Sequence, residues 1–217
     1  FDAPIPRIFS QTTGSYIDPL IIDLSDNGLQ LTSFHLDGYN TKFEMFPGKE
    51  LISTNWIASG VNDIDYNYAF LVSNDQANDI DNVINIASIT ELFSEYFNSE
   101  NNKRSFHSGS EALSSLDDNL DGIINSDDLS WQNIKLWFDD GDAISGKDEI
   151  KSIDDFISYI DLQNIRTIAT QPEWSSTNNI LRQFDAYGFS NTNDTYSIYD
   201  VGLNIAQISD TDLDLSI

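Results

Sequence analysis

The segment from Ser115 to Trp131, SLDDNLDGIINSDDLSW, places acidic and amide side chains at alternate positions. Counted from Asp117 as position 1, its oxygen donors fall at positions 1, 3, 5, 7, 9 and 12. These donors are Asp117, Asn119, Asp121, the backbone carbonyl of Ile123, Asn125 and Asp128. Ca²⁺ binds oxygen ligands at this spacing, and a glycine at position 6, here Gly122, permits the sharp turn. The spacing predicts an EF-hand-like calcium loop; the alternative is a solvated acidic turn that binds no ion.

Two features refine this prediction. Ile124 stands at position 8, where an apolar side chain fixes the loop to its neighbour. Asp128 occupies position 12, where a longer Glu usually binds the ion through both oxygens, so the affinity is expected to be lower or a smaller ion to be accepted.

Other polar loops carry weaker versions of the pattern. The segment WFDDGDAISGKDEI supplies Asp139, Asp142 and Glu149 but is one residue short of a twelve-position loop, so a distorted ion site and an ion-free turn remain equal alternatives. Asp23 begins a degenerate loop that continues to Gly28 and is counted as a further metal ligand. The loop from Asn74 to Asp81 consists mostly of neutral amides, which favours a plain polar turn.

The composition limits the possible partners. The net charge of −26 would repel nucleic acid and anionic membrane surfaces. Aspartate outnumbers glutamate by 28 to 8, which is typical of loops and calcium sites rather than of an acidic helical surface. The chain contains no cysteine, which excludes disulfides and thiolate metal sites. No apolar run approaches the ~18 residues of a membrane span, and the N-terminal residues lack a signal-peptide core.

The predicted elements that would position these loops are short strands and a few helices. Apolar and β-branched runs predict strands at residues 19–24, 29–36, 68–73, 133–138 and 165–170, and a hairpin around Asn191 to Asp194. Apolar spacing and Ser caps predict helices at residues 85–97, 108–116 and 152–160. The expected fold class is α+β, with short strands and helices organised around EF-hand-like calcium loops. The expected division is an upstream linker at 1–17, a module at 18–206 and a C-terminal tail at 207–217.

Asp18-Pro19 is the only Asp-Pro bond of the chain, and it leads directly into an apolar strand and the Asp23 loop. With the later segments TNWIAS, YAFLVSNDQAND, TELF, SEALSSLDDNLDGIINSDDLSWQNIKLWFDD, DEIKSIDDF and DVGLNI, this order resembles the self-processing module of FrpC-type RTX proteins over residues 18–206. This sequence departs from that pattern at Ser25 and Asn27, which stand where the family has acids. It also has a shortened loop near Asp139 and keeps only Asp37 and Gly38 of another acidic loop.

The resemblance implies calcium-triggered autocatalytic cleavage at Asp18 and Pro19, inside a bacterial protein exported by type I secretion to the exterior or the cell surface. The aspartyl anhydride left by the cleavage would react with water or with a lysine of a partner protein. The chemistry is reasonable, because an Asp carboxylate can close a five-membered ring on its own carbonyl carbon, provided that an acid protonates the leaving proline nitrogen. Taken alone, an Asp before Pro is also an ordinary way to begin a turn or an edge strand.

Other catalytic patterns are absent from the sequence. His35 and His107 have no metal-ligand or triad spacing, and there is no phosphate-binding glycine loop or nucleophile elbow. Trp131 and Trp137 are expected to pack in the core. Two functions remain open: a self-cleaving and cross-linking module, which is not a turnover enzyme, and a non-catalytic calcium-stabilised structural or adhesion module.

Overall fold

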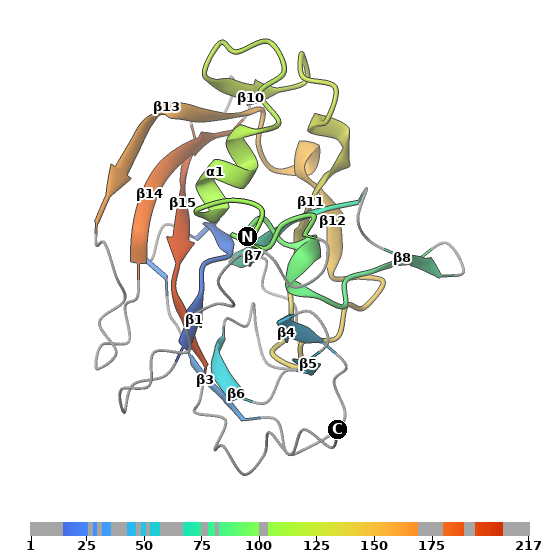
Figure 1. The fold of residues 1–217 in the computed structure, drawn as a ribbon. Coiled ribbons are helices and arrows are strands. Elements are labelled where there is room, and N and C mark those ends of the chain that lie inside the picture. The colour runs from blue at the N-terminus through green and yellow to red at the C-terminus, as the bar shows by residue number, and fades with distance from the viewer. Residues whose placement is uncertain are drawn as a thin grey trace, which may run out of the picture.

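The computed structural model describes residues 15–25, 28–29, 32–35, 43–46, 49–50, 53–56, 67–74, 78–80, 83–99, 104–168, 180–188 and 194–205. Its largest element is an antiparallel sheet of eight strands in the order β10-β13-β14-β15-β2-β7-β11-β12, which curls around its contents (Figure 1). In chain order these strands are β2 (Leu20–Asp23), β7 (Tyr68–Ser73), β10 (Ile123–Asn125), β11 (Ile134–Trp137), β12 (Ile150–Ser152), β13 (Tyr159–Thr167), β14 (Ile180–Tyr187) and β15 (Thr195–Val201).

Three smaller sheets complete the β structure of the described residues. A four-stranded sheet has the order β1-β16-β6-β3, and two hairpins pair β4 with β5 and β8 with β9. Their strands are β1 (Ser15–Ile17), β3 (Thr32–His35), β4 (Glu44–Phe46), β5 (Lys49–Glu50), β6 (Ser53–Trp56), β8 (Asn78–Ile80), β9 (Val83–Asn85) and β16 (Leu203–Ile205). Thus β1, within the segment expected to be a linker, pairs with β16.

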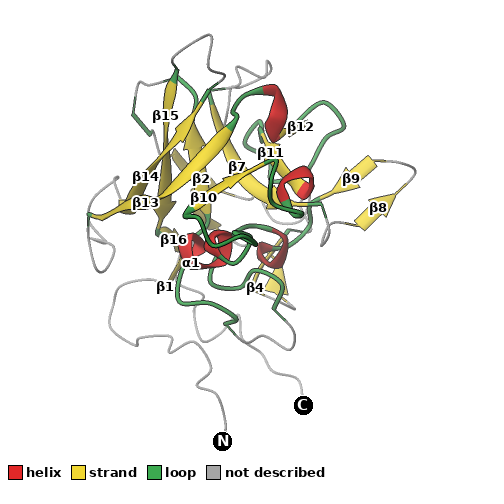
Figure 2. Cartoon of the chain, turned by 90° about the horizontal axis from the view of Figure 1, so that it is seen from above, coloured by secondary structure: helices red, strands yellow, loops and turns green. Residues whose placement is uncertain are grey.

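Helical structure is scarce in the described part of the chain. It consists of one α-helix, α1 (Gly109–Ser114), and three 3₁₀ turns, η1 (Ile89–Glu91), η2 (Trp131–Asn133) and η3 (Ile153–Asp155). Viewed from above, the helices lie among the loops beside the large sheet (Figure 2). No helix in these described ranges is long and apolar enough to cross a membrane.

The prediction of an α+β fold organised around EF-hand-like loops is therefore wrong, because the described chain is mostly β and is organised around the eight-stranded sheet. Of the three predicted helices only α1 forms, capped by Ser108 Oγ, which accepts a hydrogen bond from the Glu111 N–H. Within the helix predicted at residues 85–97, a capping box starts the 3₁₀ turn η1. The turn ends at Leu92, whose backbone is extended. The residues from Glu91 to Phe97 are all buried, so the apolar spacing reflects burial on every side and not one helix face.

The third helical prediction fails for a related reason. Ser152 has an extended backbone and its side chain caps nothing, and the segment divides into β12, η3 and the start of β13. Ile153, Ile157 and Ile160 are fully buried, and their spacing fits a turn that leads into a strand as well as a helix.

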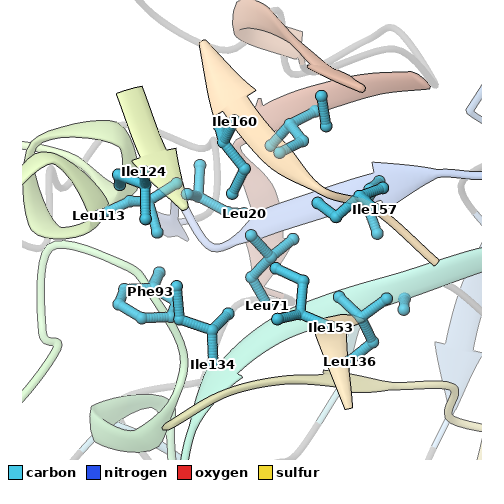
Figure 3. Packing of buried hydrophobic residues seen from close by; sticks show 14 of the residues in the cluster. Leu20, Leu71, Phe93, Leu113, Ile124, Ile134, Leu136, Ile153, Ile157 and Ile160 are labelled. Carbon is cyan, nitrogen blue, oxygen red and sulfur yellow. The ribbon is translucent and has the colours of Figure 1, made fainter. Parts of the chain in front are cut away.

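The central strands β2 and β7 of the large sheet are buried on both faces, which explains their unbroken apolar runs. Along β2, Leu20 and Ile22 face one core cluster, whereas Ile21 faces the other. Trp131 and Trp137 are buried in these clusters, which confirms the expectation of core packing. Figure 3 shows the cluster in which Leu20 lies beside Leu113 and Ile124.

The strand predictions were more successful than the helical ones. β2, β3, β7 and β11 each lie inside a predicted strand, and β14 pairs with β15 as the two arms of the predicted hairpin. The strand predicted at residues 165–170 overlaps the end of β13 at residues 165–167, and residues 169–170 lie outside the described residues. Some predictions fall outside the described residues: the loop at Asp37, Asn27, the centre of the loop after Asn74, the first 14 residues and the tail after residue 205.

Candidate functional site

The loop of residues 117–128, called the Asp117 loop below, folds around the side chain of its first residue. Asp117 Oδ1 accepts a hydrogen bond from the Asp121 N–H at 3.2 Å, and Oδ2 accepts one from the Gly122 N–H at 2.9 Å. Asn119 Oδ1 accepts a second hydrogen bond from Asp121, at 2.9 Å. Gly122 has a φ of 83°, a conformation that favours glycine. The loop turns where the sequence predicts, with the oxygens of positions 1 and 3 directed at one stretch of backbone.

Asp128 closes the Asp117 loop from its other end. It is only 3% exposed; its Oδ1 accepts a hydrogen bond from the Asp118 N–H at 2.9 Å and its Oδ2 one from the Asn125 N–H at 3.0 Å. Ile123 and Asn125 form the two ends of β10. The structure thus closes the loop between Asp117 and Asp128, and its oxygens are of the kinds that suit Ca²⁺. The acids whose oxygens gather within 4.8 Å of one another in the described residues lie in another loop, at Asp139, Asp140 and Asp142.

The loop of residues 139–149, called the Asp139 loop, is built differently. Asp139 is buried and accepts hydrogen bonds from the Gly141 and Ala143 N–H groups. One oxygen each of Asp139, Asp140 and Asp142 lie within 4.8 Å of one another, and Asp140 was not among the predicted ligands.

At its far end, Glu149 Oε2 accepts hydrogen bonds from the Gly146 N–H at 2.6 Å and the Trp137 indole N–H at 3.4 Å. Burial raises the pKa of Glu149, and the Asp140 and Asp142 carboxylates raise it further. Asp140, Asp142 and Glu149 therefore interact electrostatically, and Asp139 lies beside the two aspartates.

The loop of residues 23–28, the Asp23 loop, repeats the geometry of the Asp117 loop. Asp23 Oδ2 accepts a hydrogen bond from the Gly28 N–H at 3.0 Å, five residues on, as Asp117 does from Gly122. Gly28 also has a positive φ, of 79°. Ser25 uses both its N–H and its hydroxyl to bond Asp23 Oδ1. A serine thus stands at position 3, where a carboxylate would bind an ion more strongly.

The Asp18-Pro19 bond lies where the chain passes from one sheet to another. β1 belongs to the four-stranded sheet and ends at Ile17, whereas β2 belongs to the eight-stranded sheet and begins at Leu20. β15 and β16 make the same passage alongside, and the Val201 N–H donates a hydrogen bond to the Pro19 carbonyl at 3.1 Å. Asp18 and Pro19 are both buried. A bond that the sequence could place at a surface turn is therefore enclosed by two sheets.

Glu95 holds Asp18 at this crossing. The Asp18 N–H donates a hydrogen bond to Glu95 Oε2 at 3.0 Å, and the Glu95 N–H donates one to Asp18 Oδ1 at 3.3 Å. Burial and the neighbouring Glu95 carboxylate raise the pKa of Asp18 well above its usual value, and Asp200 adds to the effect. On the other side of Glu95, Arg104 Nη2 lies 3.5 Å from Glu95 Oε1.

Asp200 is a third buried carboxyl group near this bond. Its Oδ2 accepts hydrogen bonds from Arg182 Nη1 at 2.8 Å and from the Ser110 hydroxyl at 3.1 Å. Burial raises the pKa of Asp200 to about 6, although the Arg182 guanidinium opposes the increase. Asp18, Glu95 and Asp200 are called the buried carboxyl cluster below.

Gly109, the first residue of α1, packs against the bond from a different direction. A Cβ atom at this position would lie 2.7 Å from the Asp18 carbonyl oxygen and 2.6 Å from that of Phe93. Both distances are shorter than real contacts allow, and both neighbours are backbone atoms. Only glycine lets α1 lie this close to the carbonyl of the Asp18-Pro19 bond.

Sequence reasoning found Asp18 and Pro19 but missed the residues that surround them. Glu95 lies 77 residues from Asp18 and Asp200 lies 90 residues from Ser110, so no local spacing connects them. The helical prediction for residues 85–97 left Glu95 outside its apolar stripe. The sequence shows only a glutamate within an apolar run. Without the fold, this glutamate does not identify a site.

Comparison with known proteins gives one family match. The family model described as the SPM domain matches residues 20–204, from β2 into β16, beginning directly after Pro19. A search of the curated proteins finds no match. Since the matched region covers most of the 217 residues, the chain belongs to the SPM domain family.

Proposed function

We propose that this chain is a calcium-dependent self-processing module that cleaves its own Asp18-Pro19 peptide bond. The observation that carries the proposal is the enclosure of this bond: the Asp18 carboxyl is held by Glu95, and its carbonyl is covered by Gly109. A plain turn would need neither contact. The family description SPM fits the self-processing module that the sequence resembles.

The reaction uses atoms that the Asp18-Pro19 dipeptide supplies. The Asp18 carboxyl attacks its own carbonyl carbon, a five-membered ring closes, and the Pro19 nitrogen leaves as an amine. Fixing the attacking group beside its target makes the step intramolecular, which is worth a large effective molarity. The Glu95 N–H holds Asp18 Oδ1 and so restricts the side chain to few conformations. The resulting anhydride would be opened by water or by a lysine of another protein.

The acidic loops are joined to elements that enclose the bond. The Asp23 loop ends β2, the strand that starts directly after Pro19. The Asp117 loop follows α1, and its Ile124 packs in the same cluster as Leu20 (Figure 3). Asp117, Asn119, Asp121, Ile123, Asn125 and Asp128 would hold one ion, with further ligands in the Asp139 loop. Bound Ca²⁺ would neutralise these carboxylates and order the loops, and so couple ion binding to the fold around Asp18.

The strongly acidic charge of the chain points to a calcium-rich setting outside the cell. A chain with a net charge of −26 repels itself, and millimolar-range calcium outside the cell would relieve this repulsion. We infer that the module is part of an RTX-type bacterial protein exported by type I secretion to the exterior or the cell surface. A lysine-bearing protein would be its cross-linking partner.

A non-catalytic, calcium-stabilised structural or adhesion module is the second candidate. One observation favours it: the pKa of Asp18 is raised, and a protonated carboxyl is a poor nucleophile unless a neighbour takes its proton. Ser25, in place of an acid in the loop nearest the bond, points in the same direction.

N-terminal sequencing separates the two candidates. The chain is purified in EDTA, divided, and incubated with and without millimolar-range calcium. Self-processing predicts a new N-terminus at Pro19 that appears only with calcium, whereas the structural module predicts a calcium-dependent increase in the thermal midpoint with the chain intact. A chain that remains whole for days despite this stabilisation would rule out self-processing.

A further inference from the structure

We propose that Glu95 relays the proton of the cleavage reaction, taking it from the Asp18 carboxyl and delivering it to the Pro19 nitrogen. This inference rests on the proposed function, and it names the proton donor that the leaving proline requires.

Glu95 and Asp18 are hydrogen-bonded in both directions. The Asp18 N–H lies 3.0 Å from Glu95 Oε2, and the Glu95 N–H lies 3.3 Å from Asp18 Oδ1. Two ionised carboxyl groups this close together in a buried site repel each other, so the pair favours keeping one proton. The pair therefore stores a proton beside the peptide bond that breaks.

The surroundings of the pair place this proton on Asp18 in the resting state. Arg104 Nη2 lies 3.5 Å from Glu95 Oε1, so a cation lies on the Glu95 side of the pair. Burial and the neighbouring acids raise the pKa of Asp18. Within the described residues Glu95 Oε1 has no hydrogen-bond partner besides this ion pair, and Glu95 is 1% exposed. It is thus a buried base with an oxygen available for a proton.

The step balances without any other reactant. A bond forms between an Asp18 carboxyl oxygen and the Asp18 carbonyl carbon, and the bond from that carbon to the Pro19 nitrogen breaks. The Asp18 carboxyl proton passes to Glu95 and then to the Pro19 nitrogen, which leaves as a neutral secondary amine. Glu95 ends ionised, as it began. Glu95 Oε2 already contacts the backbone N–H of the residue whose carbonyl reacts.

Other titratable groups face the pair but are less well placed. Tyr96 and Asp200 interact electrostatically with Asp18. Asp200 is engaged through Oδ2 by Arg182 and Ser110, and among the described residues no hydrogen bond joins it to Asp18. Glu95 is the group that contacts Asp18 directly.

The test compares cleavage rates of Glu95→Gln and the wild type. Gln keeps a carbonyl oxygen that can accept the hydrogen bond from the Asp18 N–H, but it cannot take up the Asp18 proton. The variant therefore distinguishes the positioning of Asp18 from proton transfer. Each protein is purified in EDTA, calcium is added to saturation, and cleavage is followed by intact mass from about pH 5 to about pH 9. Glu91→Gln is the matched control, because Glu91 is a buried glutamate four residues away that bonds the Ala87 and Ser88 N–H groups.

The wild-type rate should fall at both ends of the pH range, since the active pair holds one proton. At the pH of fastest cleavage, Glu95→Gln should cleave at least about 100-fold more slowly than the wild type. Its rate should no longer fall at the acid end of the pH range (the acid limb), whereas the rate of Glu91→Gln should still fall at both ends. Should Glu95→Gln not fold, Arg104→Gln provides the readout: removing the cation makes the pair easier to protonate, so the acid limb should move to higher pH.

Two results would overturn the inference alone. One is a folded Glu95→Gln protein within about threefold of the wild-type rate and with both limbs. The other is an Arg104→Gln profile that coincides with that of the wild type. A wild-type chain that calcium leaves whole is a separate outcome, since it overturns the proposed function and the proton relay with it.

Discussion

The Asp117 loop and the buried carboxyl cluster contain the same chemical groups, but most carboxylates of the loop are at least partly exposed, with Asp128 the exception, whereas those of the cluster are buried. In the loop, Asp121 is exposed, and the hydrogen-bond partners of its side chain lie two residues away on either side. In the cluster, Asp18, Glu95 and Asp200 are between 0% and 5% exposed, and their partners come from distant segments. Solvated loop carboxylates are available to an ion, whereas buried carboxyl groups retain or exchange protons.

This difference suggests separate roles for the two regions: ion binding for the loop and the cleavage reaction for the cluster. Carboxylates at regular spacing in a short loop can gather around an ion without a fold to bring them together. The buried carboxyl groups come together only when the two sheets, α1 and the segment that follows η1 are in place. Cleavage should therefore depend on the buried cluster directly and on the loop through the fold.

The largest expected effect is that of Asp18→Asn, which should reduce the calcium-dependent cleavage rate by at least about 10³-fold, because a neutral amide is a poor nucleophile. Asp18→Glu should also slow cleavage, since the ring grows by one atom. Rates are measured from the appearance of the fragment that begins at Pro19. Asp155→Asn, an exposed aspartate of η3, is the control and should cleave at the wild-type rate.

Gly109→Ala should slow cleavage by about 100-fold, because a Cβ 2.7 Å from the Asp18 carbonyl oxygen forces the backbone apart and displaces the reacting atoms. The thermal midpoint should fall as well, by an amount that corresponds to about 1–3 kcal/mol of overpacking. Ser115→Ala, at the exposed C-terminal end of α1, is the control. Wild-type cleavage by Gly109→Ala would show that the close approach of α1 has no role in the reaction.

Two substitutions within the Asp117 loop should separate ion binding from loop closure. Asp121→Ala should abolish the calcium-dependent increase in the thermal midpoint and change the calcium-free midpoint little, because Asp121 is exposed. Asp128→Ala should also lower the calcium-free stability, by about 1–3 kcal/mol, since it removes a buried acceptor from the Asp118 and Asn125 N–H groups. Identical calcium-free midpoints would contradict this distinction.

The smallest effect concerns pH and Asp200. The folded state raises the pKa of Asp200 from 3.8 to about 6, so the folded state binds this proton more tightly than the unfolded state does. This group therefore adds stability as the pH falls below about 6. Between pH 7 and pH 5, without calcium, the free energy of unfolding of Asp200→Asn should rise by about 1 kcal/mol less than that of the wild type. If urea titrations show that the free energy of unfolding rises equally for both proteins, Asp200 is still ionised at pH 5 and its pKa is not raised.

The sequence predicted the local features of this molecule and missed the distant ones. β2, β7 and β11 follow from apolar runs, α1 from Ser108 as its cap, and the turn at Gly122 from the glycine in the Asp117 loop, all of which lie within a dozen residues. Calcium binding by this loop stays a prediction. The predicted helix at 85–97 failed because burial on all sides imitates helical spacing.

The buried carboxyl cluster was missed because sheet pairing creates it. Glu95 meets Asp18 only through the crossing between the two sheets, and Asp200 reaches the same place from β15. Gly109 is one of eleven glycines, and only the packing of α1 distinguishes it from the others. Local spacing therefore identified candidate ion ligands but could not identify a site assembled by tertiary structure.

Trapping the cleavage intermediate tests the central claim most directly. The uncleaved chain is mixed with calcium in the presence of Nα-acetyl-lysine, and the products are measured by intact mass spectrometry and fragmented. The proposal predicts fragments 1–18 and 19–217, with part of the shorter fragment carrying the added lysine on Asp18, because an anhydride reacts with amines. An uncut chain, a cut at another bond, or a shorter fragment that never carries the amine would contradict cleavage through an Asp18 anhydride.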